Sequence, residues 1–228
     1  MSTTNKKAYI YKMKLGPANV LCLGILALMF IVTTLVFKTN LGLSTNTFLL
    51  FISIVLYLML HEFLHGVGYF IGGCKSKNIQ YGICLEKGIF YAMAYQELTK
   101  KNILISLQMP FTVIGVITYI IGIIFNIPVL VLLSIINISG AAMDLAMFIY
   151  ISKLKNVTYS ESGNPDEFVL ISDEDLTKRK SLFVKVVDSK DYKKEDFEFS
   201  KKNKLVISKY SIIILIVFIL VGLICTIL

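Results

Sequence analysis

The sequence is poor in charged residues and in histidine, and its cysteines are not paired. Only 17% of its 228 residues are Asp, Glu, Lys or Arg, whereas soluble domains carry about 25%. Hydrophobic residues instead make up 56% of the chain. No Cys-x-x-Cys pair occurs, so we interpret the four cysteines as free thiols. This composition excludes a soluble globular domain, a disordered chain and a disulfide-stabilised scaffold.

Long apolar runs take the place of the missing charge. Five segments are apolar over roughly the length needed to cross a bilayer, namely residues 20–37, 47–72, 103–125, 128–151 and 210–228. They predict an all-α polytopic membrane protein with about five transmembrane helices. Residues 1–152 would form the membrane core, residues 153–209 a polar insert, and residues 210–228 a C-terminal transmembrane helix.

The basic residues indicate the orientation of these spans. The net charge is +8, which in a soluble protein would suggest a nucleic-acid partner, but here the positions of the charges matter more than their sum. If the N-terminus is cytoplasmic, 22 of the 23 Lys and Arg residues lie inside and only Lys38 lies outside. We therefore expect a multi-pass protein in the lipid bilayer of the cell membrane, with a cytoplasmic N-terminus and no nucleic-acid partner.

Two polar regions between the spans have strand character. Ile79–Leu85 and Ile89–Tyr95 predict a β-hairpin at the membrane surface, closed by a Gly turn, with a simple amphipathic connector as the alternative. In the polar insert, Phe168–Ser172, Ser181–Val187 and Leu205–Ser208 have strand-like patterns. These favour a small cytoplasmic α+β module.

Few ionisable groups fall at membrane depth. Of fifteen acidic residues only Glu62 and Asp144 lie inside the predicted spans, and the two histidines of the chain, His61 and His65, share a span with Glu62. No Lys or Arg accompanies them. Charged groups cost a few kcal/mol each in a bilayer, so the default interpretation is functional, and a bound cation is the simplest compensation.

His61, Glu62 and His65 form an HExxH pattern. Positions i and i+4 of a helix stack on one face about 6 Å apart, so both imidazoles can bind one metal ion. Glu62, turned by about 100°, can act as the general base toward a water that the metal activates. The alternative is a pair of core histidines with satisfied hydrogen bonds, which would leave the adjacent carboxylate unexplained.

Asp144 is the candidate for the third ligand, because catalytic zinc takes three protein ligands and keeps one open position. Asp144 and His65 lie equally far before the ends of two spans that run in the same direction, so both are roughly 10 Å from the cytoplasmic end. The small residues 139–142 would let two membrane helices approach closely. Alternatively, Asp144 forms a local hydrogen bond and the small residues serve packing alone.

These residues resemble a known group of enzymes. HEFLH in one transmembrane helix, followed in a later helix by an aspartate after small residues, is similar to the intramembrane zinc metalloproteases of the site-2 protease type. The compact layout, over about residues 47–152, more closely resembles the bacterial integral-membrane family of putative zincin peptidases, a domain of unknown function. The resemblance implies that His61, His65 and Asp144 bind zinc and that Glu62 activates water.

Together these observations predict an intramembrane zinc metallopeptidase of the bacterial cell membrane, whose active site opens toward the cytoplasm. The cofactor would be Zn²⁺, and the substrate a membrane protein or a peptide. Two other functions stay open, namely a metal transporter and a membrane scaffold that binds metal without catalysis. Transport would call for further polar residues along both halves of the spans, and the outer halves carry almost none.

Overall fold

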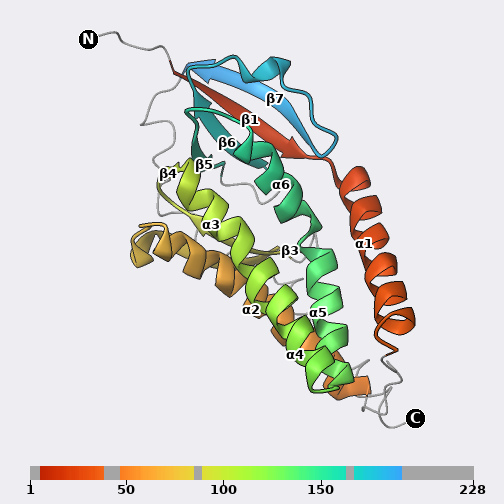
Figure 1. The fold of residues 1–228 in the computed structure, drawn as a ribbon. Helices are drawn as coiled ribbons and strands as arrows, with labels where there is room; N and C mark the ends of the chain where they lie inside the picture. The colour runs from red at the N-terminus through yellow and green to blue at the C-terminus, as the bar shows by residue number, and fades with distance from the viewer. Residues whose placement is uncertain (1–5, 39–46, 85–88, 163–166, 192–228) are drawn as a thin grey trace.

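The computed structural model describes residues 6–38, 47–84, 89–162 and 167–191. A five-stranded sheet lies at one end of a group of apolar helices, and a separate two-stranded hairpin lies beside the helices (Figure 1). With seven strands in two sheets within these ranges, the fold is mixed α and β. The prediction of an all-α membrane protein with only a hairpin and a small insert is therefore wrong.

The larger sheet is antiparallel throughout, in the order β4-β5-β6-β1-β7. Its strands are β1 (Lys7–Met13), β4 (Leu98–Thr99), β5 (Thr158–Glu161), β6 (Glu167–Ser172) and β7 (Val184–Asp191). Of the segments expected to be strands, Phe168–Ser172 lies within β6 and Ser181–Val187 overlaps the start of β7. Leu205–Ser208 lies outside the described residues.

Strand β1 explains why the fold departs from the expectation. It lies between β6 and β7, with Tyr11 opposite Phe168 on one side and Val186 on the other. Its side chains alternate between two buried clusters, with Tyr9 and Tyr11 on one face of the sheet and Ala8 on the other. Because its partners lie far along the chain, the local sequence reveals only a lysine-bearing segment before a span.

Three helical segments are long and apolar enough to cross a membrane, and a bent helix pair makes a fourth if it counts as one span. The three are α1 (Leu15–Leu35), α2 (Thr47–Ile71) and Lys100–Ile124, which comprises α3 (Lys100–Pro110), the π-helical η2 (Phe111–Ile117) and α4 (Thr118–Ile124). The pair is α5 (Pro128–Gly140) and α6 (Ala142–Ser152), bent by 44°. The described residues thus contain three candidate spans, or four with the bent pair, where the sequence predicts four; the fifth predicted span, residues 210–228, lies outside the described residues.

Helices α2 and α3 approach each other through small residues. A Cβ atom added to Gly68 would lie 2.5 Å from the Cα of Ser106, so a larger side chain would force the helices apart. Toward the middle of α2, the hydroxyl of Tyr57 donates a hydrogen bond to the carbonyl of Ile114 in η2 at 2.8 Å. Close contacts and interhelical hydrogen bonds of this kind hold helices together in apolar surroundings. They fix the face of α2 that carries His65 against α3.

The pairing of the predicted hairpin is confirmed. Strands β2 (Ile79–Cys84) and β3 (Ile89–Ala94) are antiparallel, with Ile79 opposite Ala94 and Cys84 opposite Ile89. Residues 85–88, where the Gly turn is expected, lie outside the described residues. Strand β3 contacts both α2 and β5. The hairpin therefore lies between the helix that carries HExxH and the larger sheet.

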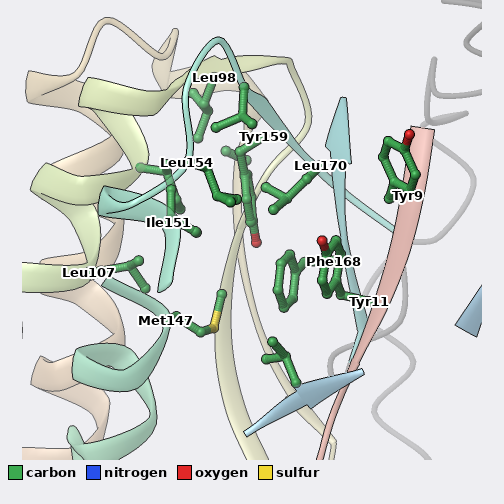
Figure 2. Packing of buried hydrophobic residues seen from close by; sticks show 14 of the residues in the cluster. Tyr9, Tyr11, Leu98, Leu107, Met147, Ile151, Leu154, Tyr159, Phe168 and Leu170 are labelled. Carbon is green, nitrogen blue, oxygen red and sulfur yellow. The ribbon is translucent and has the colours of Figure 1, made fainter. Parts of the chain in front are cut away.

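The main hydrophobic core joins the sheet to the ends of the helices. Figure 2 shows Leu107, Met147 and Ile151, from α3 and α6, facing the side chains of the sheet. Within the sheet, the rings of Tyr11 and Phe168 stack with their centroids 5.1 Å apart. The sheet thus shares one core with the helices, so its position relative to them is fixed by packing.

Candidate metal site

The three predicted ligand residues meet in one place. His61 and His65 lie one turn apart on α2, and Asp144 comes from the first turn of α6. The two Nε2 atoms are 3.2 Å apart, and Oδ2 of Asp144 lies 3.2 Å from Nε2 of His61 and 3.5 Å from Nε2 of His65. The histidines are 9% and 7% exposed. The structure therefore brings together, in a buried position, the residues that the sequence singles out.

These separations fit a tetrahedral metal ion. Zinc lies about 2.0–2.1 Å from imidazole nitrogen and carboxylate oxygen, and neighbouring corners of such a tetrahedron are roughly 3.3 Å apart. The observed separations of 3.2, 3.2 and 3.5 Å bracket that value. His61, His65 and Asp144 would fill three corners, and the fourth would accept water or substrate.

Hydrogen bonds on the far side of each imidazole direct both Nε2 lone pairs to the same point. Nδ1 of His61 lies 2.8 Å from Oδ1 of Asn137, and Nδ1 of His65 lies 2.9 Å from the carbonyl oxygen of Ser106. The Asn137 amide nitrogen donates to the carbonyl of Pro110 at 3.0 Å, which turns Oδ1 toward His61. Both Nδ1 atoms then donate, which leaves Nε2 of each neutral imidazole as an acceptor.

When both imidazoles are neutral, the two Nε2 atoms and the Asp144 carboxylate face one another as three acceptors. Buried acceptors in this position need a cation between them, either a metal ion or a proton. The donor set of two neutral imidazoles and one carboxylate is one that zinc accepts.

The bend between α5 and α6 brings Asp144 into the site. Ala141 interrupts the helix with a ψ of 4°, and Asp144 follows in the first turn of α6. The dipole of α6 favours negative charge in its first turn. The sequence predicts one span with small residues 139–142 for close packing; three of them are buried, Ser139, Ala141 and Ala142, whereas a Cβ atom on Gly140 would meet nothing within 4 Å. The small residues here accompany a break in the helix.

Glu62 stands beside the three ligand candidates rather than among them. It lines a cavity of about 370 Å³ together with His61, His65 and Asp144. The backbone N–H of Ala92 in β3 hydrogen-bonds the Glu62 carboxylate, which holds this side chain between α2 and β3. The start of α1 and strand β5 complete the wall of the cavity. A carboxylate in this position can take a proton from a water inside the cavity.

The same cavity contains a carboxylate that sequence reasoning missed. Glu161 of β5 is 4% exposed and accepts hydrogen bonds from the Tyr69 hydroxyl at 3.3 Å, from Tyr159 and from the backbone N–H of Ala94. Burial raises the pKa of Glu161 to about 7, although these three donors act in the opposite direction. The side chain ties α2, β3 and β5 together at the edge of the site.

The buried Glu161 should make stability depend on pH. Between about pH 4.5 and 7 the folded chain binds more protons at Glu161 than the unfolded chain, so stability falls as pH rises, by roughly 3 kcal/mol in total. Glu161→Gln keeps an acceptor for the tyrosines without the charge. Its melting temperature, measured in detergent with excess chelator, should fall less than that of the wild type between pH 5 and pH 8. Parallel declines in both proteins would contradict this explanation.

Other groups at the site also escape a search for ionisable residues in the spans. Asn137 lies in an apolar segment, and its uncharged polar side chain at membrane depth is a signal that a wider search would find. Ser106 contributes a backbone carbonyl, which no side-chain pattern reveals. Glu161 falls in the predicted polar insert, where nothing in the sequence distinguishes it from the other acids.

Comparison with known families agrees with this geometry. Residues 54–159 match the family model described as "Putative zincin peptidase". The matched range contains Glu62 and all three ligand candidates. No curated protein and no solved structure matches the chain significantly. The match supports a zinc metallopeptidase domain, while the likeness to site-2 proteases stays a prediction.

Proposed function

We propose that this protein, whose residues 54–159 match the putative zincin peptidase family model, is an intramembrane zinc metallopeptidase that hydrolyses peptide bonds of membrane-associated substrates. The observation that carries the proposal is the convergence of three acceptor atoms, from His61, His65 and Asp144, at tetrahedral spacing. Glu62 next to them supplies a proton acceptor in the same cavity.

Each of these residues has a defined part in hydrolysis. Zinc held by His61, His65 and Asp144 would polarise the scissile carbonyl and lower the pKa of a bound water to about 7. Glu62 takes the proton of the attacking water and returns it to the leaving amine. Asn137 fixes the tautomer and the ring orientation of His61, as the Ser106 carbonyl does for His65.

We also propose that the sheet and the mouth of the site face the cytoplasm. The apolar helices support membrane insertion, and the positive-inside rule favours this orientation for the basic residues around the sheet. A cysteine introduced at Thr39 should react with an impermeant thiol reagent added to intact cells, whereas one at Lys190 should not. Reaction at Lys190 alone would reverse the orientation.

One edge of β3 is suited to hold an extended substrate. The N–H of Tyr95 bonds to the carbonyl of Asn78 on the β2 side, and backbone groups alternate in direction along an antiparallel strand. The N–H groups of Phe90 and Ala92 therefore point away from β2. No other strand among the described residues pairs with this edge. A peptide added at Phe90 would run past Glu62, because the next two outward N–H groups, of Ala92 and Ala94, already bond to Glu62 and Glu161.

Proline substitution tests this edge. Phe90→Pro removes an outward donor and leaves the β2–β3 ladder intact, so peptide turnover should fall by roughly tenfold while zinc content and melting temperature stay near wild type. Tyr91→Pro removes an inward donor and should instead destabilise the hairpin. Phe90→Ala controls for the lost side chain, because Phe90 lines the cavity. Wild-type turnover in Phe90→Pro would show that this edge does not hold the substrate.

The function itself is tested by metal analysis and peptide hydrolysis on the purified full chain. We expect one zinc per chain, cleavage of a membrane-tethered peptide, loss of cleavage with chelator and recovery with zinc but not with magnesium. Zinc flux into liposomes without cleavage would favour a transporter. Zinc binding with neither cleavage nor flux would favour a non-catalytic scaffold.

A further inference from the structure

A second cavity, of about 390 Å³, is separate from the metal site. It lies between the last turns of α6 and residues 178–183, which follow the short helix η3 (Leu176–Lys178). None of its lining residues lines the cavity around Glu62. Any ligand here would therefore bind without contacting the proposed catalytic residues.

The walls of this cavity are strongly basic. No acidic residue lines it, and it has four cationic ones: Lys153, Lys178, Arg179 and Lys180. Two of these form ion pairs with acids outside the cavity, Lys178 with Asp175 at 3.8 Å and Arg179 with Glu174 at 3.7 Å. These pairs are solvent-exposed, so they are weak and exchange readily. Lys153 and Lys180 have no acidic partner among the described residues, so the cavity has a net attraction for anions.

Apolar side chains form the other part of the same cavity. Along α6 the wall changes within about one turn from Ile149, which is 52% exposed, to the basic Lys153. Across the cavity, Leu182 is 74% exposed and follows the basic run 178–180 closely. Helix α6 belongs to the bent pair that is apolar enough to form a span. The change from apolar to cationic therefore falls at the end of this span, where a bilayer changes from acyl chains to headgroups.

The segment that carries the cations is held in place. The backbone N–H of Lys14 donates to the carbonyl of Phe183 at 2.8 Å, and its ammonium group donates to the carbonyl of Ser181 at 3.1 Å. The hydroxyl of Tyr150 on α6 donates to the carbonyl of Arg179 at 3.5 Å. The segment that forms one wall of the cavity is thus attached both to the residue that precedes α1 and to α6, which belongs to the bent apolar pair.

We propose that this cavity binds the phosphate group of an anionic phospholipid, with an acyl chain lying along Ile149 and Leu182. Charge complementarity requires an anion, and the apolar half of the cavity favours one attached to a hydrocarbon chain over a free ion. The proposal does not depend on the peptidase function, because the cavity shares no residue with the metal site. A bound lipid here would fasten the sheet to the bilayer surface.

Native mass spectrometry of the full chain tests the proposal, with phosphatidylglycerol compared against phosphatidylcholine of the same acyl chains. Each Lys or Arg near an anionic lipid surface changes binding by about fivefold, so the double variant Lys153→Gln, Lys180→Gln should bind phosphatidylglycerol roughly 25-fold more weakly. A matched double variant, Lys75→Gln with Lys77→Gln, loses the same charge away from this cavity and should bind as the wild type does. Phosphatidylcholine binding should be equal in all three proteins.

Two further measurements separate lipid from free phosphate. Ile149→Ser should weaken phosphatidylglycerol binding, whereas 10 mM inorganic phosphate should displace little of the bound lipid. Efficient displacement by inorganic phosphate, together with no effect of Ile149→Ser, would assign the cavity to a soluble anion and overturn the lipid proposal. Equal loss of phosphatidylglycerol in the two lysine double variants would show that the attraction is general surface charge.

Discussion

Replacing Glu62 with Gln should leave zinc bound and reduce peptide hydrolysis by at least about 100-fold, the lower end of what a general base contributes. Glu62 lies outside the group of three ligand atoms, so the metal keeps all of its protein ligands. Gln is nearly isosteric and can still meet the backbone N–H of Ala92, but it cannot take a proton from water. The loss should therefore appear in kcat rather than in substrate affinity.

The measurement combines zinc content with turnover of a membrane-tethered peptide. Glu97→Gln makes the same chemical change at an exposed position outside the cavity and should behave as the wild type. If Glu62→Gln hydrolysed peptide at the wild-type rate, the proposed mechanism would be wrong even with the metal in place. If it lost zinc as well, Glu62 would belong to the ligand set.

Asp144→Ala should produce the largest loss of zinc affinity, more than the roughly 10- to 100-fold typical of changes to residues that only orient a ligand. It removes the one carboxylate among the three ligand atoms and leaves two neutral imidazoles. Asn137→Ala supplies the comparison, because it removes the partner of His61 Nδ1 without removing a ligand. The zinc affinity of Asn137→Ala should fall by about 10- to 100-fold, to a value between the affinities of the wild type and of Asp144→Ala.

Zinc affinity is measured by competition with a chromogenic chelator on the purified proteins. His65→Ala should resemble Asp144→Ala, since each supplies one corner of the proposed tetrahedron. Wild-type affinity in Asp144→Ala would move the third ligand elsewhere and leave Asp144 as a partner of the histidines. A larger loss in Asn137→Ala than in Asp144→Ala would do the same.

The candidate site could be predicted from the sequence because ionisable groups are energetically unfavourable inside a membrane, so the few that occur there stand out. His61 and His65 are fixed relative to each other by helix periodicity alone, and Asp144 follows from equal depth in a neighbouring span. The side chains indeed meet within 3.5 Å. The sequence did not point to Asn137 or to the carbonyl of Ser106, because placing an uncharged polar group in a membrane costs less free energy than placing a charge there. Such groups are therefore less conspicuous in an apolar segment.

The five-stranded sheet could not be predicted from the sequence for a different reason. Strand pairing is decided between segments that are remote in sequence, and β1 shows locally only a short run with lysines at both ends. The bend at Ala141 was equally hidden, because small residues are compatible with close packing and with a break. Hydropathy thus predicted where helices would lie, but it could not predict how strands at their ends combine or where a helix would turn.

The position of β1 between two strands from much later in the chain has a consequence for biosynthesis. Tyr11 and its partner Phe168 are about 160 residues apart, which at roughly 5–20 residues per second means that β1 leaves the ribosome about 10–30 s before β6 exists. Helix α1 begins directly after β1, so it is also synthesised before β6. The sheet, and with it the wall of the cavity that Glu161 contributes, can close only after the helices have been made. A nascent chain stopped at the end of α6 would hold all three ligand residues but leave β1 as an unpaired strand, open to association with other chains.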